Sequence, residues 1–161
     1  MFSRWENASG SSIHLYTVNP DGSGLELLYG ANSHATGTGG PVTAPAIPGA
    51  TEVQFLQPRP GEGGRLVALL KPFQGTDHGA DPVAIDTTAF VEIEQANLAN
   101  AGLQGPAQER LAINDVRTDP GLSPGGRYSS VFPLRDGTGR LLTTWTMCRL
   151  NDGAGRTLPC T

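Results

Sequence analysis

The side chains best suited to chemistry lie close together near the middle of the chain, at Asp77, His78 and Asp81. Carboxylate and imidazole groups are ordinary ligands of divalent metals, so a metal site at these residues is one interpretation. The other is a turn over residues 75–81, because Asp side chains in turns bond their own backbone. The turn is favoured. No metal site is therefore predicted, and the three residues remain only weak candidates for metal ligands.

Other catalytic chemistry has little support in the sequence. There is no Gly-x-x-x-x-Gly-Lys phosphate loop and no Cys-x-x-Cys-His haem attachment. The turn at residues 19–24 lacks the alternating acidic residues and the terminal Glu of a calcium loop. Cys148 lies in an expected strand, which is not typical of an activated thiolate. We therefore expect no catalytic residue and no cofactor; whether the protein is an enzyme stays open, and a non-catalytic role is favoured.

The two cysteines, Cys148 and Cys160, lie near the end of the sequence. Two thiols are too few for a structural zinc site, which usually takes about four ligands. They are either free thiols or a disulfide across a hairpin with arms at residues 140–150 and 157–161, since residues 151–155 have the composition of a turn. Such a bridge would stabilise the fold by about 3 kcal/mol and would indicate an oxidising compartment.

The composition of the 161 residues is rich in Gly (22) and Pro (13), with 16% charged residues and a net charge of -4. This excludes a helical bundle, a coiled coil and an acidic disordered tail. Because no basic surface is evident, we expect no binding to nucleic acid or to an anionic membrane. The longest apolar run, residues 66–70, is far shorter than the roughly 20 residues of a membrane-spanning helix. One β-rich module over residues 1–161 is expected for this length.

Short β-type runs alternate with Gly- and Pro-rich turns along the chain. The run at residues 65–70 is apolar on both faces, so it is expected to be covered on both. One short helix is expected at most, near residues 89–101. The expected strands are residues 13–18, 25–29, 52–56, 65–70, 82–86, 111–116, 127–132 and 140–150. The expected turns between them include residues 19–24, 58–64, 75–81, 123–126 and 135–139.

Two segments have related turn patterns, Tyr-Thr-Val-Asn-Pro-Asp-Gly-Ser-Gly at residues 16–24 and Ser-Pro-Gly-Gly-Arg at residues 123–127. The first resembles the signature of TolB-type β-propeller repeats, in which a strand ends before an Asp-Gly pair. The second resembles the half-signature Ser-Pro-Asp-Gly-Arg of the same repeats, with Gly125 in place of the Asp, and residues 60–65 are a looser copy. The repeat-turn residues are Asn19, Pro20, Asp21, Gly22, Ser123, Pro124, Gly125, Gly126 and Arg127.

Three further stretches narrow the resemblance: residues 4–6, residues 19–30, and residues 145–150 together with Pro159 and Cys160. They resemble bacterial propeller proteins related to the middle domain of the hydrazine synthase alpha subunit. The resemblance implies antiparallel sheets arranged as two to three blades of a partial β-propeller, since closed propellers have about four to eight blades. It implies a segment of a larger exported protein, periplasmic or extracellular, as the cysteine pair also does. The haem chemistry of hydrazine synthase is not implied, because its haem motif is missing.

The resemblance also implies a function, namely a non-catalytic binding or scaffolding module that contacts a protein or a small ligand through loops on one face. The candidate loops are residues 31–41, 75–81 and 103–110. One alternative is an accessory part of an enzyme whose catalytic or metal-binding domain lies outside this chain. Another is a self-standing domain that closes its open strand edges by forming oligomers.

Two groups of side chains allow both a structural and a binding interpretation. The aromatic residues either line a binding surface or pack between blades, and packing is favoured; they are Trp5, Tyr128, Phe132 and Trp145. The arginines of the last third either pair with nearby Asp residues or recognise an acidic ligand; they are Arg127, Arg135, Arg140 and Arg149.

Overall fold

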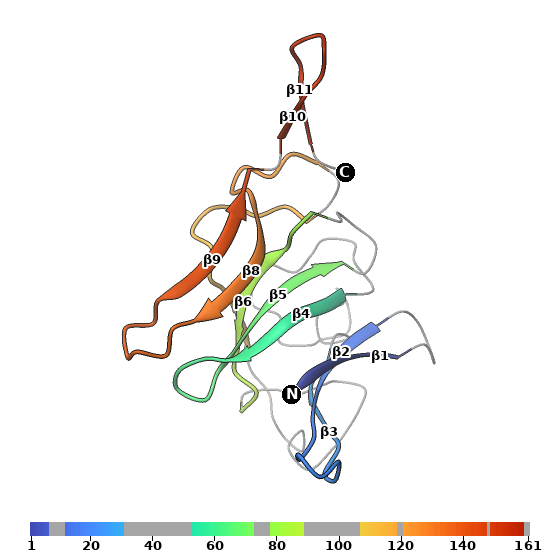
Figure 1. Cartoon of the computed structure of the whole chain (residues 1–161), viewed down its shortest axis with the longest axis vertical. Helices are drawn as coiled ribbons and strands as arrows, with labels where there is room; N and C mark the ends of the chain where they lie inside the picture. Colours follow the sequence, from blue (N-terminus) through green and yellow to red (C-terminus); the bar gives the residue numbers. More distant parts are fainter. Residues whose placement is uncertain are drawn as a thin grey trace.

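A computed structural model describes residues 1–6, 12–30, 53–72, 78–88, 107–118, 121–147 and 149–159. These residues form eleven β-strands and no helix (Figure 1), which confirms the prediction of a mainly β protein with antiparallel sheets. No helix in this part of the chain is long and apolar enough to cross a membrane. The helix expected near residues 89–101 lies outside the described residues.

The first unit is antiparallel and consists of β1 (Phe2–Glu6), β2 (Ser12–Thr17) and β3 (Glu26–Tyr29). The turn between β2 and β3 is closed by the Asn19 amide, which donates to the Ser23 carbonyl at 2.9 Å. The Asp21 carboxylate accepts hydrogen bonds from the amide and the hydroxyl of Ser23 at 3.0 and 2.7 Å. The hairpin expected around residues 19–24 is therefore present, whereas β1 was not expected.

The second unit is a meander of four consecutive antiparallel strands, β4 (Val53–Pro60), β5 (Leu66–Pro72), β6 (Asp81–Ile85) and β7 (Gln108–Arg110). A parallel pairing of Ile13 in β2 with Gln54 in β4 joins it to the first unit in one seven-stranded sheet. All seven residues of β5 are buried. The prediction that the strand at 65–70 is covered on both faces is confirmed.

The last four strands form two hairpins, β8 (Arg127–Pro133) with β9 (Leu141–Thr146), and β10 (Arg149–Asn151) with β11 (Thr157–Pro159). Strand β8 contacts β4, β5 and β6, so the β8–β9 hairpin lies across a face of the meander rather than along its edge (Figure 1). Ala80 and Tyr128 fix this layer, since the amide of each donates to the carbonyl of the other at 2.8 and 3.0 Å.

Alternate side chains of β5 enter two different hydrophobic cores, as the period of two in a strand requires. Ala68 lies in a core that also contains Leu15 and Tyr29 of the first unit. Val67 points to the opposite side, into a core with Val131 of β8. The central meander therefore packs against other parts of the chain on both of its faces.

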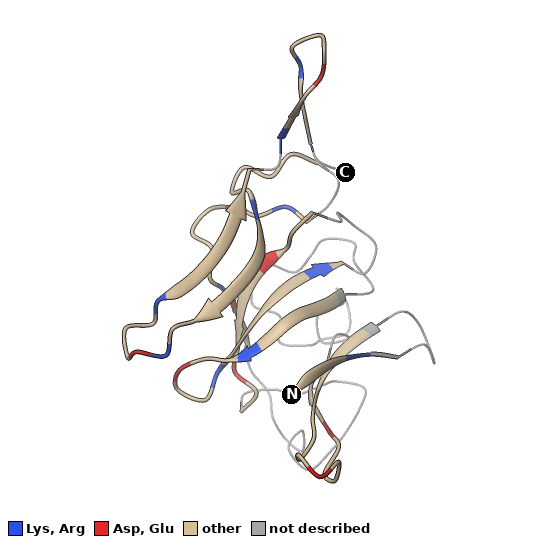
Figure 2. Cartoon of the chain, viewed as in Figure 1, with Lys and Arg blue, Asp and Glu red and all other residues tan. Residues whose placement is uncertain are grey.

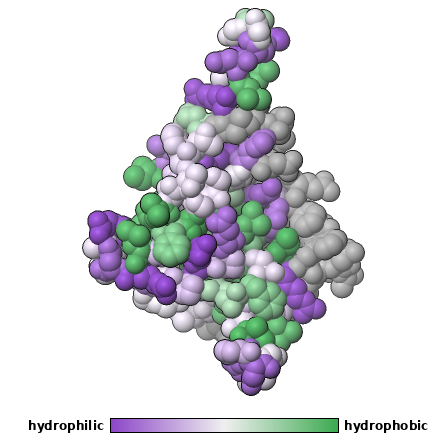
Figure 3. Space-filling model, in the orientation of Figure 1, coloured by the Kyte–Doolittle hydropathy of each residue, from purple (hydrophilic) through white to green (hydrophobic). Residues whose placement is uncertain are grey.

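Charged and apolar side chains occupy different parts of the surface. Charged residues lie largely on the turns, at the ends of the strands (Figure 2). Apolar side chains also reach the surface, and one group of them gathers over the β8–β9 hairpin (Figure 3).

The expected turn at residues 58–64 is wrong in its first half, because β4 continues as far as Pro60. The register of β4 against β5 shifts between Leu56 and Arg59, and Gln57 between them has a φ of 50°. This is a bulge, which leaves residues out of the hydrogen-bonded ladder. Pro58 lies in this bulge, where its missing amide costs no ladder hydrogen bond, so the strand continues to Pro60.

The strand expected at residues 111–116 is absent, and the strand found is β7, at Gln108–Arg110. The Leu111 amide still donates to the Pro82 carbonyl at 2.9 Å, but Ile113 is fully exposed. Its apolar side chain, which favoured a strand in the sequence, is therefore not part of a buried face.

The long strand expected at residues 140–150 is interrupted. Strand β9 ends at Thr146 and β10 begins at Arg149. The two parts pair with different strands, β9 with β8 and β10 with β11.

The predicted disulfide concerns Cys148 and Cys160, which lie outside the described residues. The neighbouring hairpin is described, and its register pairs Arg149 with Pro159 and Leu150 with Leu158. The hairpin itself is therefore present, and the disulfide stays a prediction.

We therefore expect both thiols to resist alkylation under non-reducing conditions, as measured by intact mass. Reductant should expose both thiols and lower the free energy of unfolding by about 3 kcal/mol. Two alkyl adducts without reductant would contradict the disulfide.

Candidate functional site

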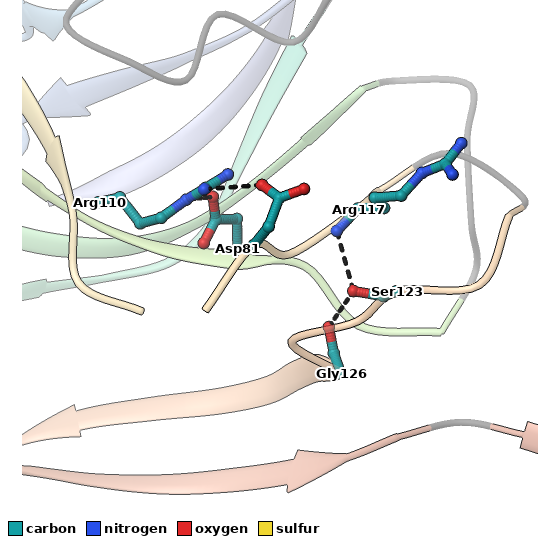
Figure 4. A network of polar contacts seen from close by, with 6 residues as sticks. Asp81, Arg110, Arg117, Ser123 and Gly126 are labelled. Carbon is teal, nitrogen blue, oxygen red and sulfur yellow. Dashed lines mark hydrogen bonds and ion pairs between the residues drawn. The ribbon is translucent and has the colours of Figure 1, made fainter. Parts of the chain in front are cut away.

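A buried ion pair links the start of β6 to the end of β7. The Asp81 side chain accepts a hydrogen bond from Arg110 Nε at 2.8 Å, and Asp81 is only 3% exposed. Arg110 also donates through Nη1 to Asp115 at 2.9 Å, on the segment that follows β7. Figure 4 shows the Arg110 side chain reaching Asp81 from the neighbouring strand. One guanidinium therefore holds two carboxylates, one buried and one exposed.

Burial dominates the electrostatics of this pair. Loss of solvent raises the pKa of Asp81 to about 6, although the hydrogen bond and charge of Arg110 oppose the shift. The Oδ1 atom of Asp81 has no hydrogen-bond partner among the described residues, and neither polar atom of the Gln108 side chain has one. Asp81 is thus a carboxyl group with an unusual pKa in a closed, polar position beneath the sheet surface.

The positions of the described side chains do not support a metal site formed by Asp77, His78 and Asp81. Asp81 is held by Arg110, whose positive charge occupies the place that a cation would take. His78 is exposed, and Asp77 lies outside the described residues. No group of three or more metal-ligating side chains occurs in the part of the chain that the structure describes.

The polar contacts continue from Asp115 into the turn that begins β8. The backbone carbonyl of Asp115 accepts a hydrogen bond from the Gly125 amide at 2.7 Å. Ser123 Oγ donates to the Gly126 carbonyl at 2.5 Å and accepts from the Arg117 amide at 2.9 Å, as Figure 4 shows. The segment after β7 and the turn before β8 are therefore fastened together through backbone groups.

Residues 121–125 are Gly-Leu-Ser-Pro-Gly, which matches the Gly-x-Ser-x-Gly pattern of serine hydrolases. This match was not among the features predicted from the sequence. That pattern carries a nucleophile only on a sharp strand-to-helix turn. Here the turn leads into strand β8, and Ser123 is buried with its hydroxyl hydrogen-bonded to the backbone. Ser123 is a structural residue of the turn.

Arg127 has a structural role of the same kind. It is 1% exposed, and its guanidinium donates to the carbonyls of Arg117 at 3.1 Å and Gly121 at 2.7 Å. Since these bonds go to the backbone of the preceding loop, Arg127 organises that loop rather than facing a ligand.

Trp145 of β9 packs against the same turn. Its indole Nε1 donates to the Gly125 carbonyl at 2.7 Å. Gly126 has a φ of 71°, and a Cβ there would lie 2.5 Å from the indole nitrogen. Only glycine fits this position, because it accepts the positive φ and leaves room for the ring. The turn thereby fixes Trp145 with 48% of its surface exposed.

The side of the β8–β9 hairpin opposite the Val131 core, here called the outer face, is exposed and largely apolar, with the Arg59 guanidinium of β4 at its border. Phe132 and Leu142 are directly paired across it and are 44% and 66% exposed. Ser130 and Thr144 continue the face and share a hydrogen bond of 2.8 Å. Strand β9 contains no charged residue. Figure 3 shows this hydrophobic area on the surface.

The expectation that the aromatic residues pack inside is therefore correct for some of them only. Tyr128 packs against the core between β5 and β8. Phe132 and Trp145 are half exposed, with the Arg59 guanidinium 5.0 Å from the centre of the Phe132 ring. The sequence did not indicate that these side chains are exposed. In β8, the alternation of inward and outward side chains is shifted between Tyr128 and Ser130.

We compared the chain with family models, curated proteins and solved structures. No match was found.

The ion pair predicts a specific dependence of stability on pH. The pKa of Asp81 is about 6 in the folded protein and 3.8 in an unperturbed chain. Between these values the folded state binds a proton that the unfolded state has released, so the contribution of Asp81 to the free energy of unfolding falls as pH rises. We expect the difference in free energy of unfolding between wild type and Asp81→Asn to fall by roughly 3 kcal/mol from about pH 3 to about pH 7.

Urea unfolding at several pH values measures this difference. Subtraction of the variant removes the contribution of Asp21, Asp136 and Asp152, whose pKa values are lowered by hydrogen bonds and which act in the opposite direction. Parallel stability curves for the two proteins would contradict the assignment.

The close approach of Gly126 to Trp145 predicts a second, independent effect on stability. Gly126→Ala should destabilise the fold by about 3 kcal/mol, because the Cβ adds a clash with Trp145 to the strain of the positive φ. Gly137→Ala is the matched control, since Gly137 has a φ of 79° and open space around it. It should cost only about 1 kcal/mol. Equal losses in urea unfolding would show that Trp145 does not constrain the turn.

Proposed function

We propose that this chain is a non-catalytic scaffolding and binding segment of an exported TolB-like β-propeller protein. The observation that carries the proposal is the outer face of β8–β9, an exposed apolar surface on a strand pair without charges in β9. Exposed apolar patches on soluble proteins mark surfaces that another protein element covers.

The arrangement of the strands supports the propeller interpretation. Strands β4 to β7 follow one another in space as they do in sequence, which is the order of a propeller blade. The β8–β9 hairpin lies on one face of this meander, and blades of a propeller also pack face to face. The Ser123–Arg127 turn, which resembles the repeat signature, joins the two layers.

The partner that best fits the outer face is another β-meander of the same protein. The inner face of β8–β9 already packs on such a meander through Val131 and Leu141. A second meander on Phe132 and Leu142 would continue the same packing with the same kind of residues. The chain would then act as one layer of a larger stack, and its function would be to position neighbouring layers.

Two described side chains with features of catalytic groups are both held in structural roles, which says nothing against an accessory part of an enzyme whose catalytic domain lies outside this chain. Asp81 has the most perturbed pKa, but it is closed off from solvent and held by Arg110. Ser123 is closed off as well, with its hydroxyl bonded to the backbone.

The proposal predicts self-association of this chain, because a second copy can take the place of a neighbouring meander on the outer face. Sedimentation velocity should show association that increases with protein concentration. Leu142→Lys should shift the protein toward monomer, since it places a charge in an apolar contact.

Leu150→Lys is the matched control, because Leu150 is also an exposed strand residue, at 55%, but lies on the β10–β11 hairpin. It should leave association unchanged, and both variants should keep the free energy of unfolding within about 0.5 kcal/mol of wild type. A chain that remains monomeric at all concentrations, or equal effects of both variants, would overturn the proposal.

A further inference from the structure

A small pocket lies where the turn between β4 and β5 meets the turn between β8 and β9. The two turns touch directly, since the Gly137 amide donates to the Glu62 carboxylate at 2.8 Å. Figure 2 shows charged residues on both turns, close together at one end of the molecule. The pocket has a volume of about 120 Å³.

The floor of the pocket is apolar. It is built from side chains of the meander and of the inner face of β8–β9, namely Val67, Ala84, Leu111, Pro133 and Leu141. A floor of this kind favours a ligand with a short hydrocarbon part, since burial of apolar surface is favourable. The volume limits that part to a few carbon atoms, because an apolar cavity of about 150 Å³ holds one benzene molecule.

The rim of the pocket is polar and carries three arginines. Arg65 is paired with Glu109 at 2.5 Å, and Arg140 is paired with Asp136 at 2.5 Å. Arg135 also lines the pocket and forms no ion pair with any residue that the structure describes. The rim also contains Glu62, whose carboxylate is bound by the Gly137 amide. Arg135 is therefore the arginine of this rim that no described carboxylate holds in an ion pair.

The backbone at Arg135 is unusual in a second respect. Its φ is 54°, in the left-handed region that costs a residue with a side chain about 1 kcal/mol or more. The turn around it has glycines with positive φ at Gly137 and Gly139, whereas this position carries a long cationic side chain. Strained residues of this kind gather at sites that bind ligands.

We propose that this pocket binds a small carboxylate with a short apolar tail, with Arg135 as the charged contact. The carboxylate would accept hydrogen bonds from the guanidinium, and the tail would lie on the apolar floor. This site goes beyond the proposed scaffolding role. It uses the inner face of the hairpin and its turn, so it is present whether or not the outer face is covered.

Sodium butyrate is a suitable probe, because it combines a carboxylate with a three-carbon tail. In a titration followed by backbone amide chemical shifts, we expect saturable changes at the pocket residues Gly139 and Leu141, with millimolar affinity. Butyramide has the same shape without the charge and should cause no saturable change. Absence of saturation with butyrate, or equal shifts with butyramide, would overturn the proposal.

Two variants test whether Arg135 provides the charged contact with butyrate. Arg135→Asn should weaken butyrate binding about tenfold, because it removes a charge-assisted contact. It should not lower the thermal midpoint, since Asn tolerates a positive φ. Arg149→Asn is the matched control, because Arg149 is an exposed arginine on β10 at the opposite end of the molecule (Figure 1). It should leave the affinity unchanged, and equal loss in the two variants would show binding to general surface charge and overturn the proposal.

The scaffolding proposal is tested separately from this one. Leu142→Lys changes the outer face and leaves the residues of the pocket in place. Self-association without butyrate binding would overturn only the pocket, and butyrate binding by a strictly monomeric chain would overturn only the scaffold.

Discussion

The placement of the β8–β9 layer depends on one line of polar contacts. It runs from Asp81 through Arg110 to Asp115, and then through the Asp115 carbonyl to the Gly125 amide. The hydrophobic contacts between β5 and β8 hold the two layers together, but such contacts have no direction. Hydrogen bonds and ion pairs do have a direction. The angle at which β8 leaves its turn is therefore set by the polar contacts.

The same polar contacts explain why the Asp81 carboxylate is buried at the start of β6. A buried ion pair adds little stability compared with apolar residues of the same size, because its charges must be removed from water. Its value here is in orientation, since Arg110 binds Asp81 and Asp115 at the same time and ties the segment after β7 to the sheet. The Ala80–Tyr128 bridge, next to Asp81 in sequence, then attaches β8 to the same point of the meander. We take the ion pair to specify geometry rather than to add to the total free energy of folding.

The parts of this fold that local sequence determines were predictable. The hairpin around residues 19–24 and the fully buried strand at 65–70 follow from turn chemistry and apolar runs, which act over a few residues. Contacts between distant residues were not predictable. Arg110 lies 29 residues from Asp81, and no pattern in the sequence connects them. The bulge that accommodates Pro58 within β4 is similarly a product of pairing with β5. The pocket arises only when two turns from different units meet.

The two proposed roles of the β8–β9 hairpin are compatible because neighbouring residues of a strand point to opposite sides. Leu141 faces the meander and helps to form the pocket floor, whereas Leu142 faces outward and pairs with Phe132. The same alternation keeps a change on one side from disturbing the other. A hairpin of this kind can hold a small anion near its turn while its outer face contacts a further protein layer. Because Trp145 and the Gly125–Gly126 turn fix the far end of the hairpin, its two faces keep their directions relative to the meander. The turn motif that resembles a repeat signature therefore acts through geometry, by orienting the two surfaces for which we propose binding roles.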